Sequence, residues 1–200
     1  MKIIAVIALL LTGLNAWAED DLSKKFGFGF AFKGEKLGAD IYSPNELGWT
    51  AIKAAGGDVL LSKSGLSQDE NSIIEGYLMT PDVPLDPISR YVDNVRKNIV
   101  AGYANNKVYS LIGFDIVPDK KKPRCVKVHL LLEKKAEANA ENSEKMFREE
   151  FTLSCGLTKN SKFGVEIGYR QYYRASNKDP LFEGKADRLF DTVVLYSPDA

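Results

Sequence analysis

The sequence has 200 residues, of which 27 are lysine or arginine and 27 are aspartate or glutamate. This balance gives no electrostatic footprint for nucleic acid, because a phosphate backbone has to be neutralised by an excess of basic side chains. Glycine (16) and proline (8) are too few for a low-complexity chain, and no long apolar run follows the N-terminus, which excludes a polytopic membrane protein. The composition is typical of one globular domain and does not by itself indicate an activity.

Residues 1–18 have the pattern of a signal peptide that is removed after export. Lys2 precedes an apolar core, and the Ala-Trp-Ala of residues 16–18 places small side chains at both positions that a signal peptidase inspects. The apolar core has about a dozen residues, too few to cross a bilayer of roughly 30 Å as a helix, so we expect no membrane span. We predict cleavage before Glu19, a mature chain of residues 19–200, and a location in the periplasm or outside the cell.

The chain has two cysteines, Cys125 and Cys155, both in the predicted mature part. In an oxidising compartment such an even pair usually closes, so we predict one disulfide, which restricts a loop of about 30 residues in the unfolded state. A metal or redox site with cysteine ligands would need three or four convergent ligands or a Cys-x-x-Cys motif. His129 is the only histidine and that motif does not occur, so we expect no metal and no cofactor.

The N-terminal part of the mature chain predicts short strands. Residues 26–32 alternate phenylalanine with glycine or alanine, which is typical of a strand with one thick face and one nearly bare face. The bare face, formed by Gly27, Gly29 and Ala31, either packs against the fold or lets another backbone or a ligand approach closely. Glycine, lysine and aspartate in residues 33–44 predict a turn or open loop. Further strands are predicted at residues 49–53, 59–62 and 72–80.

Two segments have helical periodicity, and each begins after an Asp-Pro pair. Asp86 is expected to cap the first helix, and Pro87 suits the first helical position because its missing N–H would have no partner there. The first helix is predicted to end at Asn105, and the second to run from Asp179-Pro180 to Ser197-Pro198. The apolar face of the first helix is formed by Ile88, Tyr91, Val92, Val95, Ile99 and Tyr103, and that of the second by Ala186, Leu189, Phe190, Val193 and Val194.

The second half of the chain predicts long strands. Residues 134–145 form a polar segment between two of them, either a frayed helical turn or a loop. The first two strands are expected to form an antiparallel hairpin, because only a short turn punctuated by proline separates them. The four strands are predicted at residues 107–117, 125–133, 146–155 and 162–174.

The expected disulfide tests the register of these strands. If Cys125 and Cys155 face each other in neighbouring antiparallel strands, Val126 shares a face of the sheet with the polar Ser154. Either a bulge breaks this register or both faces of the sheet are partly covered. We favour covered faces, because two amphipathic helices have to pack somewhere.

Together these elements predict an α+β fold: a single domain, residues 19–200, with a mostly antiparallel sheet of six or seven strands flanked by two main helices. The order of the elements resembles the PsbP-like fold of small exported proteins, through Gly27-Phe28-Gly29-Phe30, the helix at 87–104, the tyrosine-rich strand at 168–173 and the helix at 186–195. The resemblance implies a non-catalytic accessory or binding role, although a fold is a poor warrant for function.

Two groups of residues are candidates for binding a partner. The turn between the first two long strands carries the densest basic cluster, which either contacts acidic or anionic groups or only keeps the turn soluble. In the last strand, alternation places Tyr169 and Tyr173 on one face, where we expect core burial, and a tyrosine with two arginines on the other. The candidates are Lys120, Lys121, Lys122 and Arg124 in the turn and Arg170, Tyr172 and Arg174 in the strand.

Three hypotheses about function remain. The first is an exported, non-catalytic accessory protein that binds another protein or an envelope component, and it predicts no deep pocket. The second is a small-molecule or lipid binder with a cavity of roughly 300 Å³ or more between sheet and helix, at the bare face described above. The third is an unidentified hydrolase, which would need acids of perturbed pKa in that cavity. His129 belongs to no catalytic motif, and Glu149 and Glu150 point to opposite faces of their strand.

Overall fold

The computed structural model describes residues 23–32, 34–55, 57–135, 144–158 and 162–197. The predicted signal peptide and most of the polar segment at 134–145 lie outside these ranges. No helix within them combines the length and apolar character that a membrane crossing requires.

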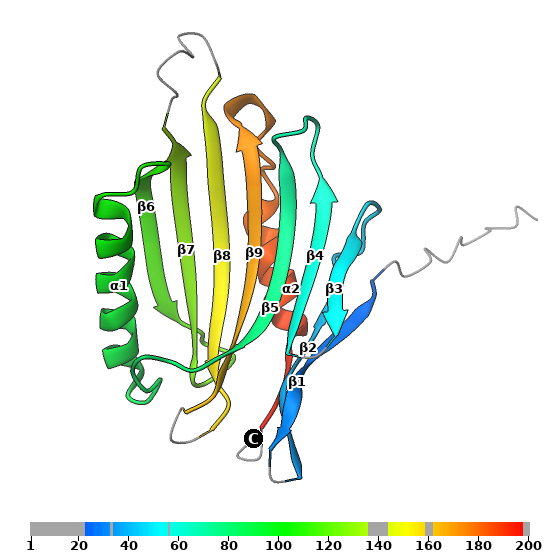
Figure 1. Ribbon diagram of the computed structural model, residues 1–200, viewed down its shortest axis with the longest axis vertical. Helices are drawn as coiled ribbons and strands as arrows, with labels where there is room; N and C mark the ends of the chain where they lie inside the picture. Colours follow the sequence, from blue (N-terminus) through cyan, green and yellow to red (C-terminus); the bar gives the residue numbers. More distant parts are fainter. Residues whose placement is uncertain (1–22, 33, 56, 136–143, 159–161, 198–200) are drawn as a thin grey trace, which may run out of the picture.

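Within the described ranges the chain forms two antiparallel sheets and two α-helices (Figure 1). The three-stranded sheet has the order β1 (Lys25–Phe32), β2 (Glu35–Tyr42) and β10 (Val194–Tyr196). The seven-stranded sheet has the order β3 (Thr50–Ala55), β4 (Asp58–Ser64), β5 (Asn71–Met79), β9 (Gly164–Arg174), β8 (Met146–Gly156), β7 (Cys125–Lys134) and β6 (Tyr109–Pro118). The helices are α1 (Ile88–Ala104) and α2 (Phe182–Thr192), and a short 3₁₀ turn (Ala175–Asn177) follows β9.

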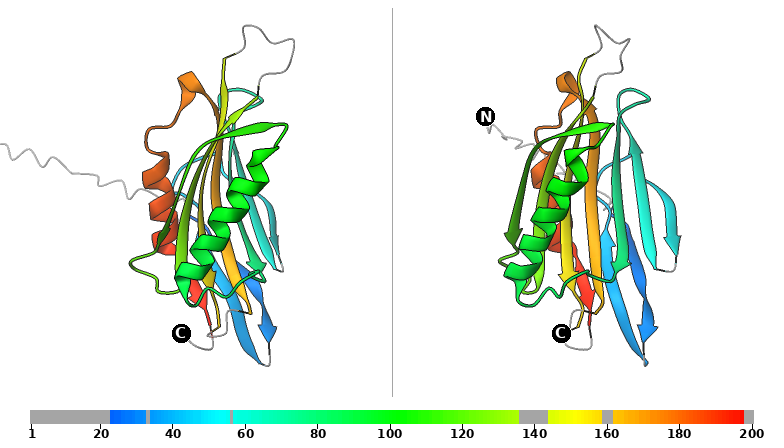
Figure 2. Two further views of the ribbon diagram at one scale, coloured as in Figure 1. Left: turned by 90° about the vertical axis from the view of Figure 1, so that its left-hand side faces the viewer. Right: turned by 60° about the vertical axis from the view of Figure 1, so that its left-hand side comes forward.

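This architecture confirms the α+β class, with a seven-stranded antiparallel sheet and two main helices, and adds a small second sheet. Figure 2 shows that α1 and α2 lie on opposite sides of the seven-stranded sheet. We call the side that packs against α2 the α2 face and the other side the α1 face. The three-stranded sheet packs on the α2 face, since β1 contacts β3, β4 and β5 while β2 contacts α2 and β9.

The α2 face holds the main hydrophobic core. Phe182 of α2 makes edge-to-face contacts with Tyr169 of β9 and Phe151 of β8, at ring-centroid distances of 4.8 and 5.5 Å. Phe28 of β1 lies over Gly76 of β5, where a Cβ would come within 2.6 Å of the phenylalanine ring. The core also includes Leu37, Ile41, Leu61, Ile74, Leu153, Ile167, Ala186, Leu189 and Phe190, all buried. The expected core burial of Tyr169 and Tyr173 is confirmed.

The α1 face has a smaller core beneath its helix. Tyr91 of α1, Ile116 of β6 and Val126 of β7 are buried there, and Val95 and Ile99 pack against them. Both faces of β7 are therefore covered, and β7 pairs with β8 without a register shift, as we expected. The predicted disulfide is present between Cys125 and Cys155, which are opposite residues of these two strands.

The prediction of a loop at residues 33–44 was wrong, because most of that segment is β2. Gly34, at φ 85°, makes the turn that lets β2 fold back on β1. Leu37, Ala39 and Ile41 then alternate into the core. On the bare face of β1, the backbone of β2 comes so close that a side chain would not fit. A Cβ on Gly29 would lie 2.1 Å from the carbonyl oxygen of Leu37. The polar composition of this segment suggested a loop. Its apolar side chains recur at every second residue, which is the spacing of a strand with one buried face.

The helix boundaries also differ from the predictions. Asp86 does not cap α1: the N-cap is Pro87, with no side-chain hydrogen bond to the first turn. Asp179 does not cap α2 either: the N-cap is Leu181, with no side-chain cap hydrogen bond, and Asp179 accepts from the Leu181 N–H at 2.9 Å in the turn before the helix. The chain after Val193 is strand β10, because pairing with β2 overrides a local pattern that would continue the helix.

Candidate functional site

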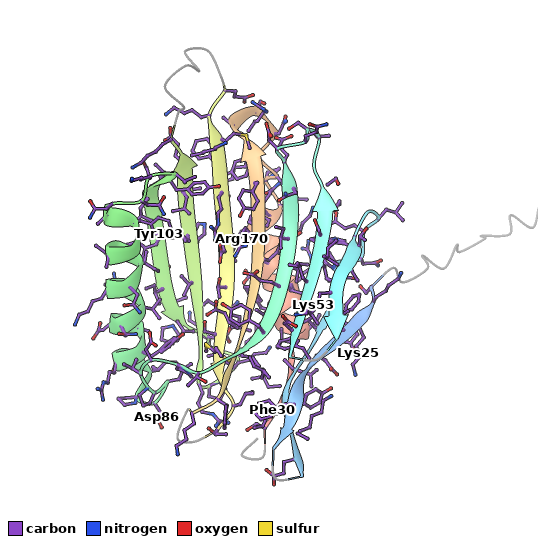
Figure 3. All side chains as sticks on the ribbon, in the orientation of Figure 1. Lys25, Phe30, Lys53, Asp86, Tyr103 and Arg170 are labelled. Atoms are coloured by element: carbon purple, nitrogen blue, oxygen red, sulfur yellow. A yellow bond between two sulfur atoms is a disulfide. The ribbon has the colours of Figure 1, made fainter. Side chains whose placement is uncertain are left out.

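The α1 face of β5, β9 and β8 is polar and only partly covered. α1 contacts β6 and β7, so the middle strands of the sheet lie beside the helix, and none of the described helices or strands lies over them on this face (Figure 1). Figure 3 labels Arg170 near the centre of this face and Tyr103 on α1. The polar side chains occupy alternate positions: Glu75 and Tyr77 on β5, Arg148, Glu150, Thr152 and Ser154 on β8, and Glu166, Arg170 and Tyr172 on β9.

A groove of about 420 Å³ runs between α1 and this polar face. We call it the α1 groove. Its sheet side is formed by side chains of β7, β8 and β9, and the chain segment before α1 closes one end. The groove is lined by Met79, Thr80, Pro81, Asp82, Tyr91, Asn94, Val95, Asn98, Ile99, Tyr103, Leu130, Arg148, Glu150 and Glu166.

A network of two arginines and two glutamates lies along the groove. Arg170 donates to Glu75 Oε1 at 2.5 Å and to Glu150 Oε2 at 2.9 Å. Arg148 pairs with the same Oε2 atom, and its Nε lies 3.1 Å away. Burial alone would raise the pKa of Glu150, but the adjacent Arg170 and Arg148 lower it. Glu150 therefore stays ionised, and the network holds its side chains in fixed positions.

Glu166 lies beside this network but has different partners. The hydroxyl of Tyr77 donates to Glu166 Oε1, and Ser154 Oγ donates to Oε2 at 3.1 Å. No lysine or arginine of the described ranges forms an ion pair with Glu166. Burial raises the pKa of Glu166, and the negative charges of Glu150 and Glu75 raise it further, against the lowering effect of the two hydroxyls. Glu166 is thus a carboxyl group in the groove without a cationic partner.

The groove and its network carry more acidic than basic groups. Both oxygens of Glu150 already accept hydrogen bonds, from the two arginines and from Thr152 Oγ1 at 3.3 Å. The oxygens of Glu166 also accept hydrogen bonds, but only from neutral hydroxyls, so its charge is not offset by a cation as that of Glu150 is. In the part of the chain that the structure describes, no three His, Cys, Asp or Glu side chains gather as metal ligands would. The acidic groups are Glu75, Asp82, Glu150 and Glu166, against Arg148 and Arg170.

None of the three strand candidates from the sequence lines the groove, but Arg170 and Tyr172 contact the lining residues Glu150 and Arg148. Arg170 is part of the charge network, with a side-chain exposure of 16%. Tyr172 is the partner of Arg148 in the register, and the guanidinium lies 5.9 Å from its ring centroid. Arg174 lies further along the strand and pairs with Asp69 at 3.0 Å.

The acidic half of the site was not predicted from the sequence. Glu75 and Glu166 come from strands far apart in the sequence, and only the order β5-β9-β8 brings them together with Glu150. One signal was available, namely the polar Ser154 at a position that shares its face with Val126. Ser154 is itself buried, and its hydroxyl donates to Glu166 at 3.1 Å, so a polar residue at this position indicates a polar partner on the same face.

The basic turn lies elsewhere, against the C-terminal end of α2. Lys121 pairs with Asp191 at 2.6 Å, and Lys122 Nζ lies 3.5 Å from the Asp191 carbonyl oxygen. Asp119 Oδ1 accepts hydrogen bonds from the backbone N–H groups of Lys121 and Lys122, which fixes the turn. Lys120 is exposed and Arg124 is partly buried. The turn and Arg170 therefore do not form one surface, because they belong to opposite faces of the sheet.

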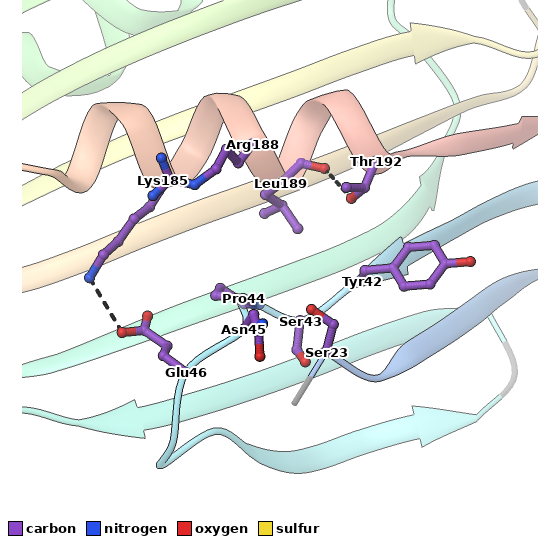
Figure 4. Close-up of a pocket in the computed structure, with 10 residues that line it drawn as sticks. All are labelled: Ser23, Tyr42, Ser43, Pro44, Asn45, Glu46, Lys185, Arg188, Leu189 and Thr192. Carbon is purple, nitrogen blue, oxygen red and sulfur yellow. Dashed lines mark hydrogen bonds and ion pairs between the residues drawn. The ribbon is translucent and has the colours of Figure 1, made fainter. Parts of the chain in front are cut away.

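A second cavity of about 290 Å³ lies between α2 and the chain after β2 (Figure 4). Two of its three charged groups, Glu46 and Lys185, are paired: Glu46 accepts from Lys63 at 2.8 Å and from Lys185 at 3.4 Å. Burial alone would raise the pKa of Glu46, but these two lysines lower it. We take the α1 groove as the candidate site because it is the larger of the two and holds a carboxyl group, that of Glu166, with no cationic partner among the described residues. Gly27, Gly29 and Ala31, where the sequence suggested a pocket, line neither of the two cavities.

The single histidine lies on the α2 face. His129 Nε2 is 2.9 Å from Glu149 Oε1, and its ring stacks on Phe151 at a centroid distance of 4.2 Å. Tyr173 and Lys178 also interact with Glu149, each at 3.2 Å. Burial alone would raise the pKa of Glu149, but hydrogen bonds from His129 and Lys178 lower it. This cluster joins β7, β8 and β9 and is separate from the groove.

No family model matches the sequence, and no curated protein matches it. Several solved structures align with the chain. The solution structure of cyanobacterial PsbP (CyanoP) from Synechocystis sp. PCC 6803 aligns with 14% identity over 88% of this chain and 94% of that protein, with a TM-score of 0.42. The Ran-binding protein Mog1p of Saccharomyces cerevisiae aligns with 10% identity over 88% and 97%, with a TM-score of 0.47.

LpqN of Mycobacterium tuberculosis, which is involved in cell envelope biogenesis, aligns with 8% identity over 89% of this chain and 94% of its own, with a TM-score of 0.48. The alignment with the cyanobacterial PsbP structure spans most of both chains. At these identities and TM-scores, the fold class rests on the strand order and helix placement described above.

Proposed function

We propose that the protein is an exported, non-catalytic accessory protein that binds another protein of the cell envelope, and that the α1 groove is its binding site. The observation that carries the proposal is the groove, which is open to solvent rather than a deep pocket and in which apolar side chains of α1 meet charged side chains held in place by their neighbours. Binding is favoured when such groups are ordered before the partner arrives, because less conformational entropy is then lost.

Export is supported by two features of the chain. Residues 1–18 have the composition of a signal peptide, and the Cys125–Cys155 disulfide is the state that an oxidising compartment favours. Mass spectrometry of the native protein tests this part: we expect an N-terminus at Glu19 and no free thiol. An intact Met1 or two free thiols would overturn it.

The basic turn is a second possible contact within the same proposal. Lys120 is exposed, and the neighbouring lysines are partly engaged by the end of α2. Lys120, Lys121, Lys122 and Arg124 together would suit an acidic or anionic surface. The test of the groove therefore includes these residues.

A small-molecule binder is the alternative, and the size of the groove favours it. The groove has a volume of about 420 Å³. This exceeds roughly 300 Å³, which is the lower end of the range that small-ligand sites usually have. Native mass spectrometry of protein purified from its source tests the alternative. A bound molecule of constant mass that is lost on denaturation would favour a small-molecule binder.

The groove is tested by recovery of partners from envelope extract with three forms of the protein. Asn98 is an exposed residue of α1 that lines the groove. The variant Asn98→Trp places a bulky side chain in the groove and leaves the buried Tyr91 unchanged. In the second variant, the four basic residues of the turn are changed to serine. We expect the wild type and the turn variant to recover the same partner and Asn98→Trp to lose it.

The opposite pattern, with loss of the partner in the turn variant and retention in Asn98→Trp, would reject the groove as the contact. A variant at Glu183, an exposed residue of α2, serves as a control for nonspecific effects of substitution. Equal recovery by all forms would reject both surfaces.

A further inference from the structure

The α1 groove has apolar and acidic groups side by side. Val95 and Ile99 of α1 and Leu130 of β7 are apolar lining residues. Glu166 of β9 and Asp82, from the segment before α1, are acidic ones. A ligand that satisfies both kinds of group has an aliphatic stem and a positively charged end.

We propose that the α1 groove binds a lysine or arginine side chain of a partner polypeptide, with the aliphatic stem against Val95 and Ile99 and the charged end against Glu166. This inference rests on the binding function proposed above and adds the chemistry of the partner.

The charge distribution supports a cation. The two arginines of the network are shared between Glu75 and Glu150, and in the described ranges neither is paired with Glu166. Hydrogen bonds from Tyr77 and Ser154 fix the position of the Glu166 carboxyl group without adding charge. A cation bound there would offset the burial that raises the pKa of Glu166.

The α1 side of the groove favours a polypeptide as the source of the cation. Asn94 and Asn98 line the α1 side of the groove, and their amides can both donate and accept hydrogen bonds. The backbone of a partner segment has both donors and acceptors, whereas a small free amine has no acceptor to use them. Lysine and arginine side chains also pack their stems on apolar surface while the charge stays at the polar end.

The test is an NMR titration of the ¹⁵N-labelled protein, with its disulfide intact, against two synthetic pentapeptides. One is acetyl-Ala-Ala-Lys-Ala-Ala-amide, and the other has norleucine in place of lysine and so keeps the stem without the charge. We expect the lysine peptide to shift the amide signals of Asn94, Asn98 and Glu166 in a saturable way. We expect the norleucine peptide to bind at least about fivefold more weakly, because the charged contact is lost.

Variants at two acidic lining residues and one control position sharpen the test. Glu166→Gln keeps the shape of the side chain and one accepting oxygen, and its NH2 group can donate to the second hydroxyl, which can also accept. We therefore expect the variant to fold and to lower the affinity for the lysine peptide about fivefold or more. Asp82→Asn, at an exposed position, should lower it by about twofold because solvent screens that charge. Glu183→Gln on α2 should leave it unchanged.

Three results would overturn the inference. These are equal binding of the two peptides, full affinity in Glu166→Gln, and the absence of saturable shifts with either peptide. n-Butylammonium is titrated in parallel, and if it binds as tightly as the lysine peptide, the ligand is a free amine and the polypeptide partner is wrong. A partner recovered by the wild type and lost by Asn98→Trp would still support the groove if the peptides fail, so the two proposals can fail separately.

Discussion

The α2 face of β8 and β9 carries Leu153, Ile167 and Tyr169 beneath α2, whereas the α1 face of the same strands carries Glu150, Glu166 and Arg170. Side chains of a strand alternate between faces, so neighbours in the sequence belong to environments of opposite polarity. One face is sealed by a helix and a second sheet. The other is covered by a helix along only part of its width.

This difference separates stability from binding. Burying apolar side chains stabilises a fold by about 25 cal/mol per Å² removed from water, so the α2 face is the main source of stability. Charged side chains that lose solvent recover little net free energy from pairing, so the network on the α1 face is poorly explained by stability alone. A half-covered face with fixed charges is better explained as a surface for a partner.

The largest expected effect is on the sealed face. Phe182→Ala removes a buried ring that contacts Phe151 and Tyr169, and we expect it to lower the free energy of unfolding by about 3–5 kcal/mol. Ile99→Ala under the half-covered face should cost less than half of that, because Ile99 is only partly buried. Urea unfolding followed by tryptophan fluorescence compares the two. Equal losses would mean that the two faces contribute alike to stability.

The disulfide is expected to have the next largest effect. The double variant Cys125→Ser with Cys155→Ser opens a loop of 30 residues, which should lower the free energy of unfolding by about 3–4 kcal/mol in the loop-entropy account. Wild type unfolded under reducing conditions should match the double variant. If the reduced wild type is as stable as the oxidised protein, the disulfide does not stabilise the fold by restricting the unfolded chain.

On the half-covered face, Arg170→Met should lower the free energy of unfolding by about 2 kcal/mol, because it leaves Glu75 and Glu150 with fewer cationic partners. Arg174→Met is the matched control in the same strand. Its partner Asp69 is 67% exposed, so the change in stability should be close to zero. A loss at Arg174 as large as that at Arg170 would contradict the assignment of the network to a partly buried face.

The smallest effect concerns pH. The pKa of Glu166 is raised in the folded protein above its ordinary value of 4.5, because burial and neighbouring carboxylates disfavour the ionised form. The folded state therefore binds this proton more tightly than the unfolded state, so stability is lost as pH rises from 4.5 through the folded-state pKa. As pH rises from 4.5 through the folded-state pKa, the free energy of unfolding of the wild type should therefore fall relative to that of Glu166→Gln. Parallel stability profiles of the two proteins would show that the pKa of Glu166 is not raised.

The sequence predicted elements whose pattern is local and long. The helix at 88–104 and the strand at 164–174 were found because their apolar residues recur with a constant period. β2 was missed because its polar residues suggested a loop, and one of them, Asp40, is buried beside Lys25 and Tyr196. β10 was missed because its three residues become a strand only by pairing with β2.

The candidate site was only partly accessible from the sequence. Arg170 and Tyr172 were identified because alternation within one strand places them on the same face. Glu75, Glu150 and Glu166 were not identified, because their proximity depends on the order of three strands. That order is set by long-range pairing, which no local pattern contains.

The pairing of β10 with β2 has a consequence for how the fold is completed. The Tyr196 hydroxyl donates to the Asp40 carboxylate across 156 residues of sequence. A ribosome or a translocation channel would therefore have to release the chain through Tyr196 before the three-stranded sheet could be complete. A truncation before Val194 would leave the β2 edge open to strands of other chains, so the C-terminus is a poor place to shorten this protein.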